Sequence, residues 1–196
     1  CCSLLQEYLI QFGDIAITIE DPPELRMEGK HGRFGQCFQI KVRDGDFAKP
    51  LRSALRYNPR FILLGEIRDP EAASEALRAA ISGHIVLATI HGGSIPEALT
   101  SVLKLVSARL DLDLAKSMLG DGIAAVLHQE LRLVTASDGR AERRPFVKSL
   151  FFDGDQGLRS KIREGKMELI STEIEQQKMR LARGEPAVAV RKPTGR

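Results

Sequence analysis

The sequence lacks the features that mark membrane, secreted and nucleic-acid-binding chains. No apolar run approaches the ~20 residues of a membrane-spanning helix, and no signal-peptide layout is visible. Its three cysteines form no even framework, which favours a reducing compartment, so we expect the protein in the cytoplasm. Aromatic residues make up 5% of the chain and do not interleave with basic ones, and the net charge is only +3. We therefore expect no direct contact with nucleic acid.

The most informative segment is a strand–helix–strand pattern in the middle of the chain. Phe61–Leu64 and Ile85–Ile90 are short apolar runs, as expected of strands buried in a parallel sheet. Between them, Asp69 and Pro70 form a helix start and Gly83 a helix stop. The apolar stripe of this helix is expected at Ala73, Ala76, Leu77, Ala80 and Ile81. The pattern predicts an α/β fold with a mostly parallel sheet.

A further strand candidate, Ile15–Ile19, lies upstream and runs into an acidic segment. The two prolines that follow cannot donate to a sheet ladder, so the strand should stop near Glu20. The other two apolar runs are likewise followed by polar groups, Glu66 and His91. In open α/β sheets ligands bind at the carboxyl ends of the strands, so we expect these three side chains to converge there.

Downstream, the pattern becomes mostly helical. Ile95–Val106 has one apolar face, and helical periodicity continues from Leu114 through Leu127. Two later helices are expected over Leu158–Ile170 and Thr172–Ala182, the second starting with a capping box formed by Thr172 and Glu175.

A short hairpin interrupts these helices. Its predicted strands are Leu131–Val134 and Phe146–Phe152, joined by a polar turn over Ser137–Arg144. The chain then divides into a core over residues 1–134, a hairpin and helices over 135–185, and a disordered tail over 186–196.

Three segments keep a recognisable order and spacing between Ile15 and Leu131. They are TIEDPPEL (Thr18–Leu25), LRSALRYNPRFILLGEIRD (Leu51–Asp69) and GHIVLATIH (Gly83–His91). Together they resemble the catalytic core of the type II/IV secretion ATPases, a superfamily that includes pilus retraction motors and the ATPases of conjugation and type IV secretion. The resemblance implies a RecA-like P-loop NTPase core, truncated at its N-terminus and followed by a helical C-terminal region, with ATP and Mg²⁺ as cofactors.

The resemblance implies a role for each group at the predicted strand ends. Glu20, Asp21 and Glu24 fall on the family's acidic box near the metal and the attacking water, with Glu20 and Asp21 as the implied metal ligands. Glu66 falls on the Walker B glutamate, which orients or activates that water. His91 falls on the histidine that senses the γ-phosphate. Taken alone, each could instead be a solvated strand-end or turn residue.

Two arginines also match basic positions of the family. Arg52 and Arg56 precede the Walker B segment, where positive charge can face a bound nucleotide's phosphate or a neighbouring subunit. Because they lie four residues apart on one helical face, they can equally form a solvated pair.

One element of the family's site does not occur in this sequence. ATPases of this class need G-x-x-x-x-G-K-[ST], whose backbone amides and lysine hold the β- and γ-phosphates. In the family this loop precedes the TIEDP element by roughly twenty residues, which places it at or just before Cys1. Cys1–Phe12 would then be the rest of the phosphate-loop helix. Its buried stripe is expected at Leu4, Leu5, Tyr8 and Leu9.

Two functions from different classes follow. In the first, the chain is the carboxyl part of a motor ATPase. The resemblance implies that such a motor forms a homo-hexamer and works at the inner membrane with components of a secretion, conjugation or pilus apparatus. In the second, the chain is catalytically inactive as it stands and acts only as a binding or assembly module. On either reading the chain alone should neither bind ATP well nor hydrolyse it.

Overall fold

The computed structural model describes residues 1–135 and 140–188, which form two compact units. The first unit comprises Cys1–His91 and Ser101–Gly122, and the second comprises Gly92–Thr100 and Ile123–Arg196. The boundary expected after residue 134 falls inside a strand, Ala125–Thr135, so the structure divides the chain elsewhere. Residues 189–196 of the expected tail lie outside the described residues.

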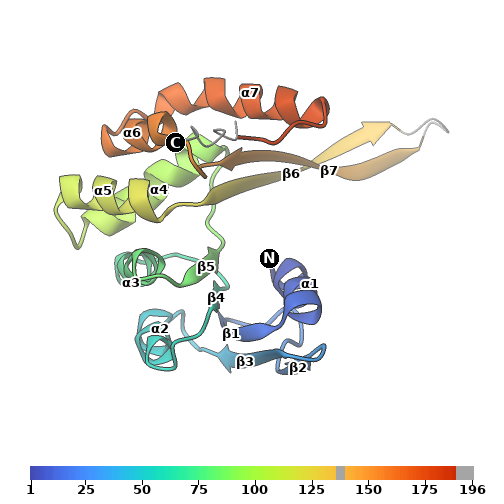
Figure 1. Cartoon of the computed structure of the whole chain (residues 1–196), viewed down its shortest axis with the longest axis vertical. Helices are drawn as coiled ribbons and strands as arrows, with labels where there is room; N and C mark the ends of the chain where they lie inside the picture. Colours follow the sequence, from blue (N-terminus) through green and yellow to red (C-terminus); the bar gives the residue numbers. More distant parts are fainter. Residues whose placement is uncertain (136–139, 189–196) are drawn as a thin grey trace, which may run out of the picture. The chain divides into compact units, whose positions relative to one another are not determined.

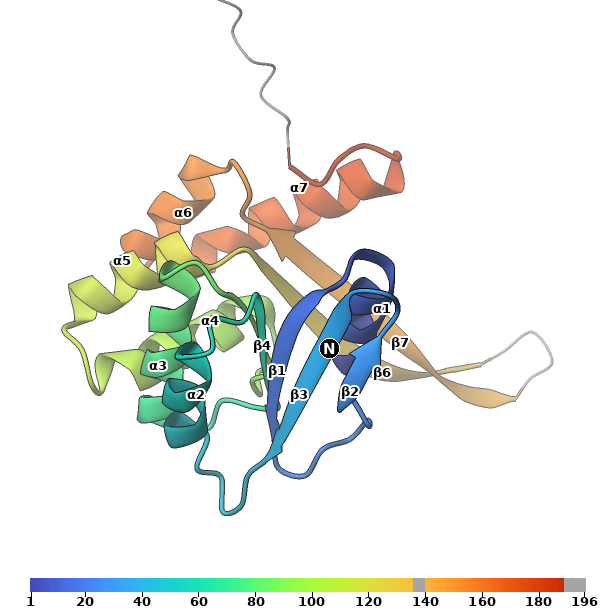
Figure 2. The same cartoon turned by 60° about the horizontal axis from the view of Figure 1, so that its bottom comes forward.

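A five-stranded sheet forms the centre of the first unit (Figure 1). Its strands are β1 (Asp14–Glu20), β2 (Gly29–His31), β3 (Gly35–Lys41), β4 (Phe61–Leu64) and β5 (Ile85–Ala88), in the order β2-β3-β1-β4-β5. Figure 2 looks onto this sheet and shows β4, β1, β3 and β2 side by side. Four strands are parallel and only β2 is antiparallel. The predicted α/β fold with a mostly parallel sheet is therefore confirmed.

Helices cover both faces of this sheet. On one face, α2 (Ala48–Leu55) and α3 (Pro70–Ile81) bury Ile17 and Ile19 of β1 and Ile62 and Leu64 of β4. On the other face, α1 (Cys2–Phe12) packs with Leu5 and Leu9 against Ala16, Cys37, Phe61 and Leu63. Alternate residues of each strand thus face opposite helix layers, which is the pattern of a sheet covered on both sides.

Helix α3 begins as predicted but is buried on two sides. The carboxylate of Asp69 accepts the backbone N–H groups of Glu71 and Ala72 at 2.9 and 2.8 Å. Ala72, Ala76 and Ala79 face the sheet, whereas the predicted stripe residues Leu77, Ala80 and Ile81 lie close to Gly122 at the end of α5 (Leu112–Gly122). Small side chains on both sides allow α3 to lie close to the sheet and to α5.

Two predictions of burial in the first unit are only partly correct. In α1, Leu5 and Leu9 are fully buried as predicted, but Leu4 is 62% and Tyr8 36% exposed, so half of the predicted stripe faces solvent. Strand β5 was expected to be buried through Ile90. It ends at Ala88, lies at the edge of the sheet and leaves Ile85 partly exposed. An apolar run alone does not tell an edge strand from a central one.

The second unit begins with the first turns of α4 (Ile95–Ser107) and continues with a long hairpin. Strands β6 (Ala125–Thr135) and β7 (Ala141–Phe151) pair antiparallel, with Ala125 opposite Phe151 and Thr135 opposite Ala141. The helix expected to continue through Leu127 is therefore wrong: α5 ends at Gly122, and the next apolar residues enter a strand. The turn expected over Ser137–Arg144 is also too long, because its last four residues belong to β7. Residues 136–139 lie outside the described residues.

Two helices and a 3₁₀ turn complete this unit. The single helix expected over Leu158–Ile170 is instead α6 (Gln156–Arg163) followed by the 3₁₀ helix η1 (Met167–Ile170). They are separated at Gly165, which has a positive φ of 75° that ends the helix. Helix α7 (Ser171–Ala182) forms as predicted, but no described side chain caps its start, so the predicted capping box is wrong.

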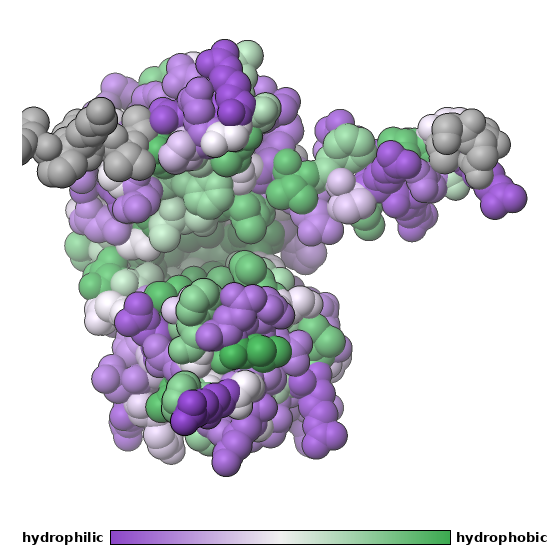
Figure 3. Space-filling model, turned by 45° about the vertical axis from the view of Figure 1, so that its right-hand side comes forward, coloured by the Kyte–Doolittle hydropathy of each residue, from purple (hydrophilic) through white to green (hydrophobic). Residues whose placement is uncertain are grey.

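The side chain of Gln177 in α7 hydrogen-bonds to both the backbone N–H and the carbonyl of Phe151, the last residue of β7. Its oxygen accepts the N–H of Phe151 and its amide donates to the carbonyl of the same residue, both at 2.8 Å. Farther along the hairpin, Leu127, Leu131, Leu133 and Val147 are exposed. Figure 3 accordingly shows apolar and charged side chains next to each other on the hairpin.

We expect Asp69→Ala to lower the free energy of unfolding by about 1 kcal/mol, because two backbone N–H groups at the start of α3 lose their acceptor. Thr172→Ala is the matched comparison. Its side chain caps no helix in the described residues, so this substitution should change stability by less than about 0.5 kcal/mol. Urea unfolding followed by circular dichroism measures both. Equal losses would contradict the assignment of Asp69 as the dominant cap.

Candidate functional site

The register of the parallel strands places the predicted site residues at one edge of the sheet. Ile19 of β1 lies opposite Leu64 of β4, and Leu64 lies opposite Ala88 of β5. Each strand ends at or just after this row. Glu20 follows at once, Glu66 two residues after Leu64, and His91 three residues after Ala88. The predicted convergence of these three side chains at the carboxyl edge is therefore what the backbone produces.

Glu66 lies in a loop that is tied to the strands on both sides. The N–H of Gly65 donates to the carbonyl of Ile19 at 2.8 Å, and that of Ile67 donates to Thr89 at 2.9 Å. The Glu66 side chain is only 15% exposed, and its two carboxylate oxygens face Arg68 and His91. One oxygen forms a close ion pair with Arg68, and the other lies 3.8 Å from Nε2 of His91. The imidazole itself is 96% exposed.

Glu20 is the most deeply buried acid of the site, with 2% of its surface exposed. Each of its carboxylate oxygens has a hydrogen-bond donor. Nε2 of Gln39 donates to Oε1 at 2.9 Å, and the thiol of Cys2 lies 3.5 Å from Oε2. A buried carboxylate needs such donors, since an unpaired charge would be costly away from water.

Asp21 points to the other side of the strand end. Its Oδ2 accepts the backbone N–H of Gly45 at 3.1 Å, which ties the end of β1 to the loop between β3 and α2. An open pocket of about 600 Å³ lies here. It is lined by Asp21, Arg43, Asp44, Gly45, Arg68 and Asp69.

Within residues 1–135 and 140–188, no hydrogen bond joins the remaining predicted residues to Glu20, Glu66 or His91. Glu24 is exposed, but its charge acts on the Cys2 thiol that contacts Glu20 and contributes to raising the pKa of that thiol. Arg52 pairs instead with Glu71 of α3 at 2.6 Å and lies 3.7 Å from Glu75, so it links α2 to α3. This hydrogen bond raises the pKa of the Arg52 guanidinium and lowers that of the Glu71 carboxyl. Arg56, the C-cap of α2, is exposed.

The acids fit Mg²⁺ only as part of a nucleotide site. In such sites the ion is held by one or two carboxylates together with substrate phosphates and water. Within the described residues, no group of three or more His, Cys, Asp or Glu side chains is placed to hold a metal ion alone. Both oxygens of Glu20 already accept hydrogen bonds, and Asp21 is held by Gly45. Glu20 therefore suits contact through a water bound to the ion better than direct ligation.

Comparison with known proteins places this arrangement in a family. The family model described as "Type II/IV secretion system protein" matches residues 4–183, which is most of the chain. The chain belongs to this family. The resemblance predicted from TIEDPPEL, GEIRD and GHIVLATIH is therefore confirmed.

Its relatives in the family include pilus and secretion proteins. The chain is 31% identical over 159 residues to a twitching motility protein of Neisseria gonorrhoeae, covering 81% of this chain and 41% of that protein. It is 38% identical over 116 residues to type II secretion system protein E of Klebsiella pneumoniae, covering 59% of this chain and 21% of that protein.

Solved structures of the family share the fold. The pilus retraction motor PilT with bound ADP gives a TM-score of 0.74 at 26% identity, over 91% of this chain and 49% of the PilT chain. The ATPase DotB of Legionella pneumophila gives a TM-score of 0.73 at 25% identity, over 94% of this chain and 52% of the DotB chain. The chain thus spans about half the length of these solved relatives. No described helix is long and apolar enough to cross a membrane.

Three side chains that contact Glu20 and Glu66 at this edge of the sheet were not predicted from the sequence. Arg68 follows Glu66 by two residues, within the motif itself, and could have been considered from its charge. Gln39 and Cys2 contact Glu20 from β3 and α1, and no motif points to either of them. Their roles depend on strand pairing and helix packing, which the spacing of residues does not reveal.

The surroundings of Glu20 also change the acidity of two thiols. Burial, then the charge of Glu20 and its hydrogen bond, raises the pKa of the Cys2 thiol. Burial, then the charges of Glu28 and Glu20, raises the pKa of the Cys37 thiol to about 12. Both thiols are therefore protonated, and only weakly nucleophilic, at neutral pH.

We expect Glu20→Gln to lower the pKa of the Cys2 thiol, because a neutral amide no longer repels the thiolate. Each pKa unit gives about tenfold more thiolate at a pH below the pKa. Alkylation of Cys2 by iodoacetamide, followed by peptide mass spectrometry over a range of pH, measures the change. Cys37 is the internal control and should react only after unfolding, since it is fully buried. An unchanged Cys2 profile would contradict the contact with Glu20.

Proposed function

We propose that this chain is the carboxyl-terminal part of the catalytic core of an ATPase that powers type II/IV secretion, conjugation or pilus dynamics. Proteins similar to it include the type IV pilus assembly ATPase PilB of Pseudomonas aeruginosa and the VirB11 ATPase of the Brucella suis type IV secretion system. The single observation that carries the proposal is the convergence of Glu20, Glu66 and His91 at the carboxyl ends of neighbouring parallel strands. Ligand sites of α/β proteins lie at this edge.

In the proposed mechanism, Glu66 orients and polarises the attacking water. Phosphoryl transfer depends mainly on positioning and on neutralising charge, so a fixed carboxylate near the transferred group is the main contribution expected from this edge. The backbone bonds of Gly65 and Ile67 hold Glu66 in place. His91, 3.8 Å away, is placed to respond to the same event, as the family's phosphate-sensing histidine does.

Glu20 has a supporting role in this proposal. Mg²⁺, which in this family arrives with ATP, neutralises phosphate charge when bound. Glu20 is fixed by two donors, so it can hold a water of the ion's hydration shell in one orientation. Arg52 and Arg56 are not assigned to the nucleotide, since Arg52 is engaged by Glu71. The homo-hexamer and the inner-membrane partners stay predictions from the family resemblance.

A second function of another class remains for the chain as it stands. Its sequence contains no G-x-x-x-x-G-K-[ST] run, so it lacks the amides and the lysine that hold the β- and γ-phosphates. Without these donors, nothing from the phosphate loop offsets the repulsion between the acids at the sheet edge and the phosphates of a nucleotide. In that form the chain is a binding or assembly module.

The test compares ATP hydrolysis by the 196-residue chain with ATP hydrolysis by the full product of its gene. In a gene product that carries the phosphate loop in frame before Cys1, Glu66→Gln should lower kcat for ATP hydrolysis by about 10²-fold or more, since the amide cannot accept a proton from water. The 196-residue chain alone should show no turnover and weak nucleotide binding.

Glu175→Gln is the matched control, because Glu175 lies on α7, outside the sheet edge, and pairs with the exposed Lys178. It should leave kcat unchanged. Turnover by the isolated chain that disappears in Glu66→Gln would contradict the need for the loop. Absence of an in-frame phosphate loop in the gene would favour the binding module over the ATPase.

A further inference from the structure

The carboxamide of Gln39 holds the acidic segment Glu20–Met27 at three points. Its Nε2 donates to Oε1 of Glu20 at 2.9 Å and to the carbonyl of Leu25 at 2.8 Å. Its Oε1 accepts the backbone N–H of Met27 at 3.1 Å. One side chain on β3 thus contacts the beginning, the middle and the end of this segment.

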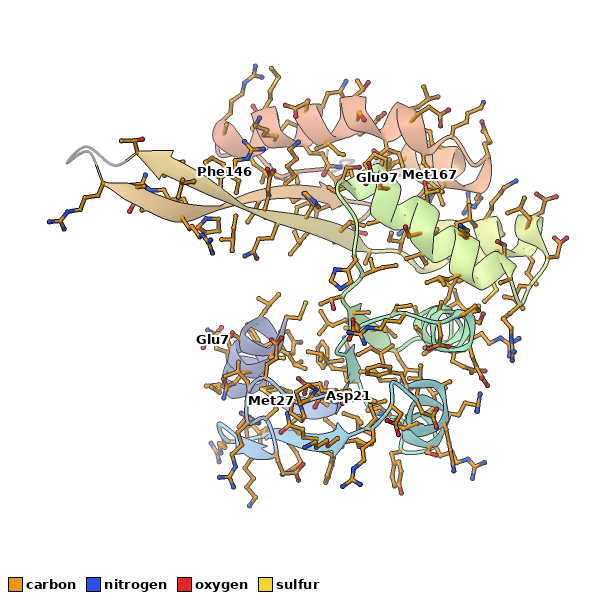
Figure 4. The ribbon with its side chains drawn as sticks, turned by 180° about the vertical axis from the view of Figure 1, so that it is seen from behind. Glu7, Asp21, Met27, Glu97, Phe146 and Met167 are labelled. Atoms are coloured by element: carbon orange, nitrogen blue, oxygen red, sulfur yellow. The ribbon has the colours of Figure 1, made fainter. Side chains whose placement is uncertain are left out.

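The segment has few other means of keeping its shape. Pro22 and Pro23 have no N–H to donate, and the segment forms no helix or strand of its own after Glu20. Asp21 is tied to Gly45, and the carbonyl of Met27 lies 2.7 Å from Nε2 of the buried His31. Figure 4 labels Asp21 and Met27, near the two ends of the segment. Between these two contacts, Gln39 hydrogen-bonds both to the backbone of the segment and to the Glu20 carboxylate, and so connects them.

We propose that Gln39 is a positioning residue for nucleotide hydrolysis, which fixes the Glu20 carboxylate relative to the loop that follows it. The inference rests on the proposed function of Glu20. A carboxamide suits the position because it has two donor hydrogens, for Glu20 and Leu25, and an acceptor oxygen for Met27. Neither a carboxylate nor an apolar side chain of the same size supplies this set.

The charges around this amide make a glutamate substitution informative. Gln39→Glu would place two carboxylates within hydrogen-bond distance, and such a pair is relieved by sharing one proton. A third carboxylate, that of Glu28, accepts the backbone N–H of residue 39 at 2.5 Å and adds to the repulsion. The other titratable or charged groups on the elements around it are Cys2, Glu7 and Tyr8 of α1, Asp14 of β1, Asp21, Glu24 and Arg26 of the segment, Lys30 and His31 of β2, and Cys37 and Lys41 of β3.

The first part of the test measures the contact in the 196-residue chain. Gln39→Met removes the acceptor for the Met27 N–H, so hydrogen exchange of this amide, read by NMR, should become about tenfold faster or more. Gln39→Glu keeps an acceptor oxygen and should retain most of the protection. Gln36→Met is the matched control, because Gln36 lies on the same strand and, within the described residues, its side chain hydrogen-bonds only to the carbonyl of Cys37. Unchanged exchange in Gln39→Met would overturn the proposal.

The second part measures ATP hydrolysis by the full gene product that carries the phosphate loop. Gln39→Glu should lower kcat on the order of 10-fold or more above neutral pH, with KM for ATP changed much less. The deficit should shrink as the pH falls and the shared proton is retained. Gln39→Met should show a deficit that does not depend on pH, and Gln36→Glu should behave as the unmodified protein. Because the carboxylate pair also makes the stability of the fold depend on pH, kcat is expressed per folded molecule, with the folded fraction measured by circular dichroism at each pH. A residue that acts only on folding would then give no difference in kcat between the two Gln39 variants.

The outcomes separate this inference from the function on which it rests. If Glu20→Gln leaves kcat unchanged, the proposed role of Glu20 fails whatever Gln39 does. If Glu20→Gln lowers kcat but Gln39→Glu matches the unmodified protein at every pH, the proposed function stands and the role of Gln39 is wrong.

Discussion

The site depends on the parallel register of β1, β4 and β5. Because Ile19, Leu64 and Ala88 lie in one row, three segments that are far apart in the sequence end at the same edge. The covered faces of the sheet hold this row in place. Ile17 and Ile19 of β1 are buried against α2 and α3, so a slip of β1 by one residue would turn them toward α1 and place Thr18 and Glu20 in the layer under α2 and α3. The positions of Glu20 and Glu66 are consequences of this packing.

Much of this arrangement could be predicted from the sequence. The apolar runs at Phe61–Leu64 and Ile85–Ile90, the Asp69 cap and the stop before Pro22 are local signals, and they predicted β4, β5, α3 and the end of β1. Strands β2 and β3 carry no comparable signal and were not predicted. The segment after Gly122 was misassigned because a short apolar run fits a helix or a strand equally well, and only its pairing with β7 decides between them. The break in Leu158–Ile170 was missed although Gly165 marks it.

The residues at the candidate site could be predicted from the sequence more readily than the contacts between them. That Glu20 and Glu66 lie at the strand ends follows from where the apolar runs stop. Gln39 and Cys2 contact Glu20 because β3 and α1 pack beside β1. The spacing of residues in the motif does not reveal this packing. Arg52 shows the converse. Its position in the motif suggested contact with a phosphate or a neighbouring subunit, but the packing of α2 on α3 places the carboxylate of Glu71 beside it. A motif specifies residue types, and packing decides which charges remain available.

Glutamine side chains complete backbone hydrogen bonding in both units. Gln39 serves a segment that contains two prolines, and Gln177 serves the end of a strand in a two-stranded sheet. The second case bears on solubility. A two-stranded sheet exposes backbone groups that can recruit a strand from another molecule, which is a common start of aggregation. At Phe151 both groups are already satisfied by an amide of the same chain, so an incoming strand would have to displace Gln177 before it could add there.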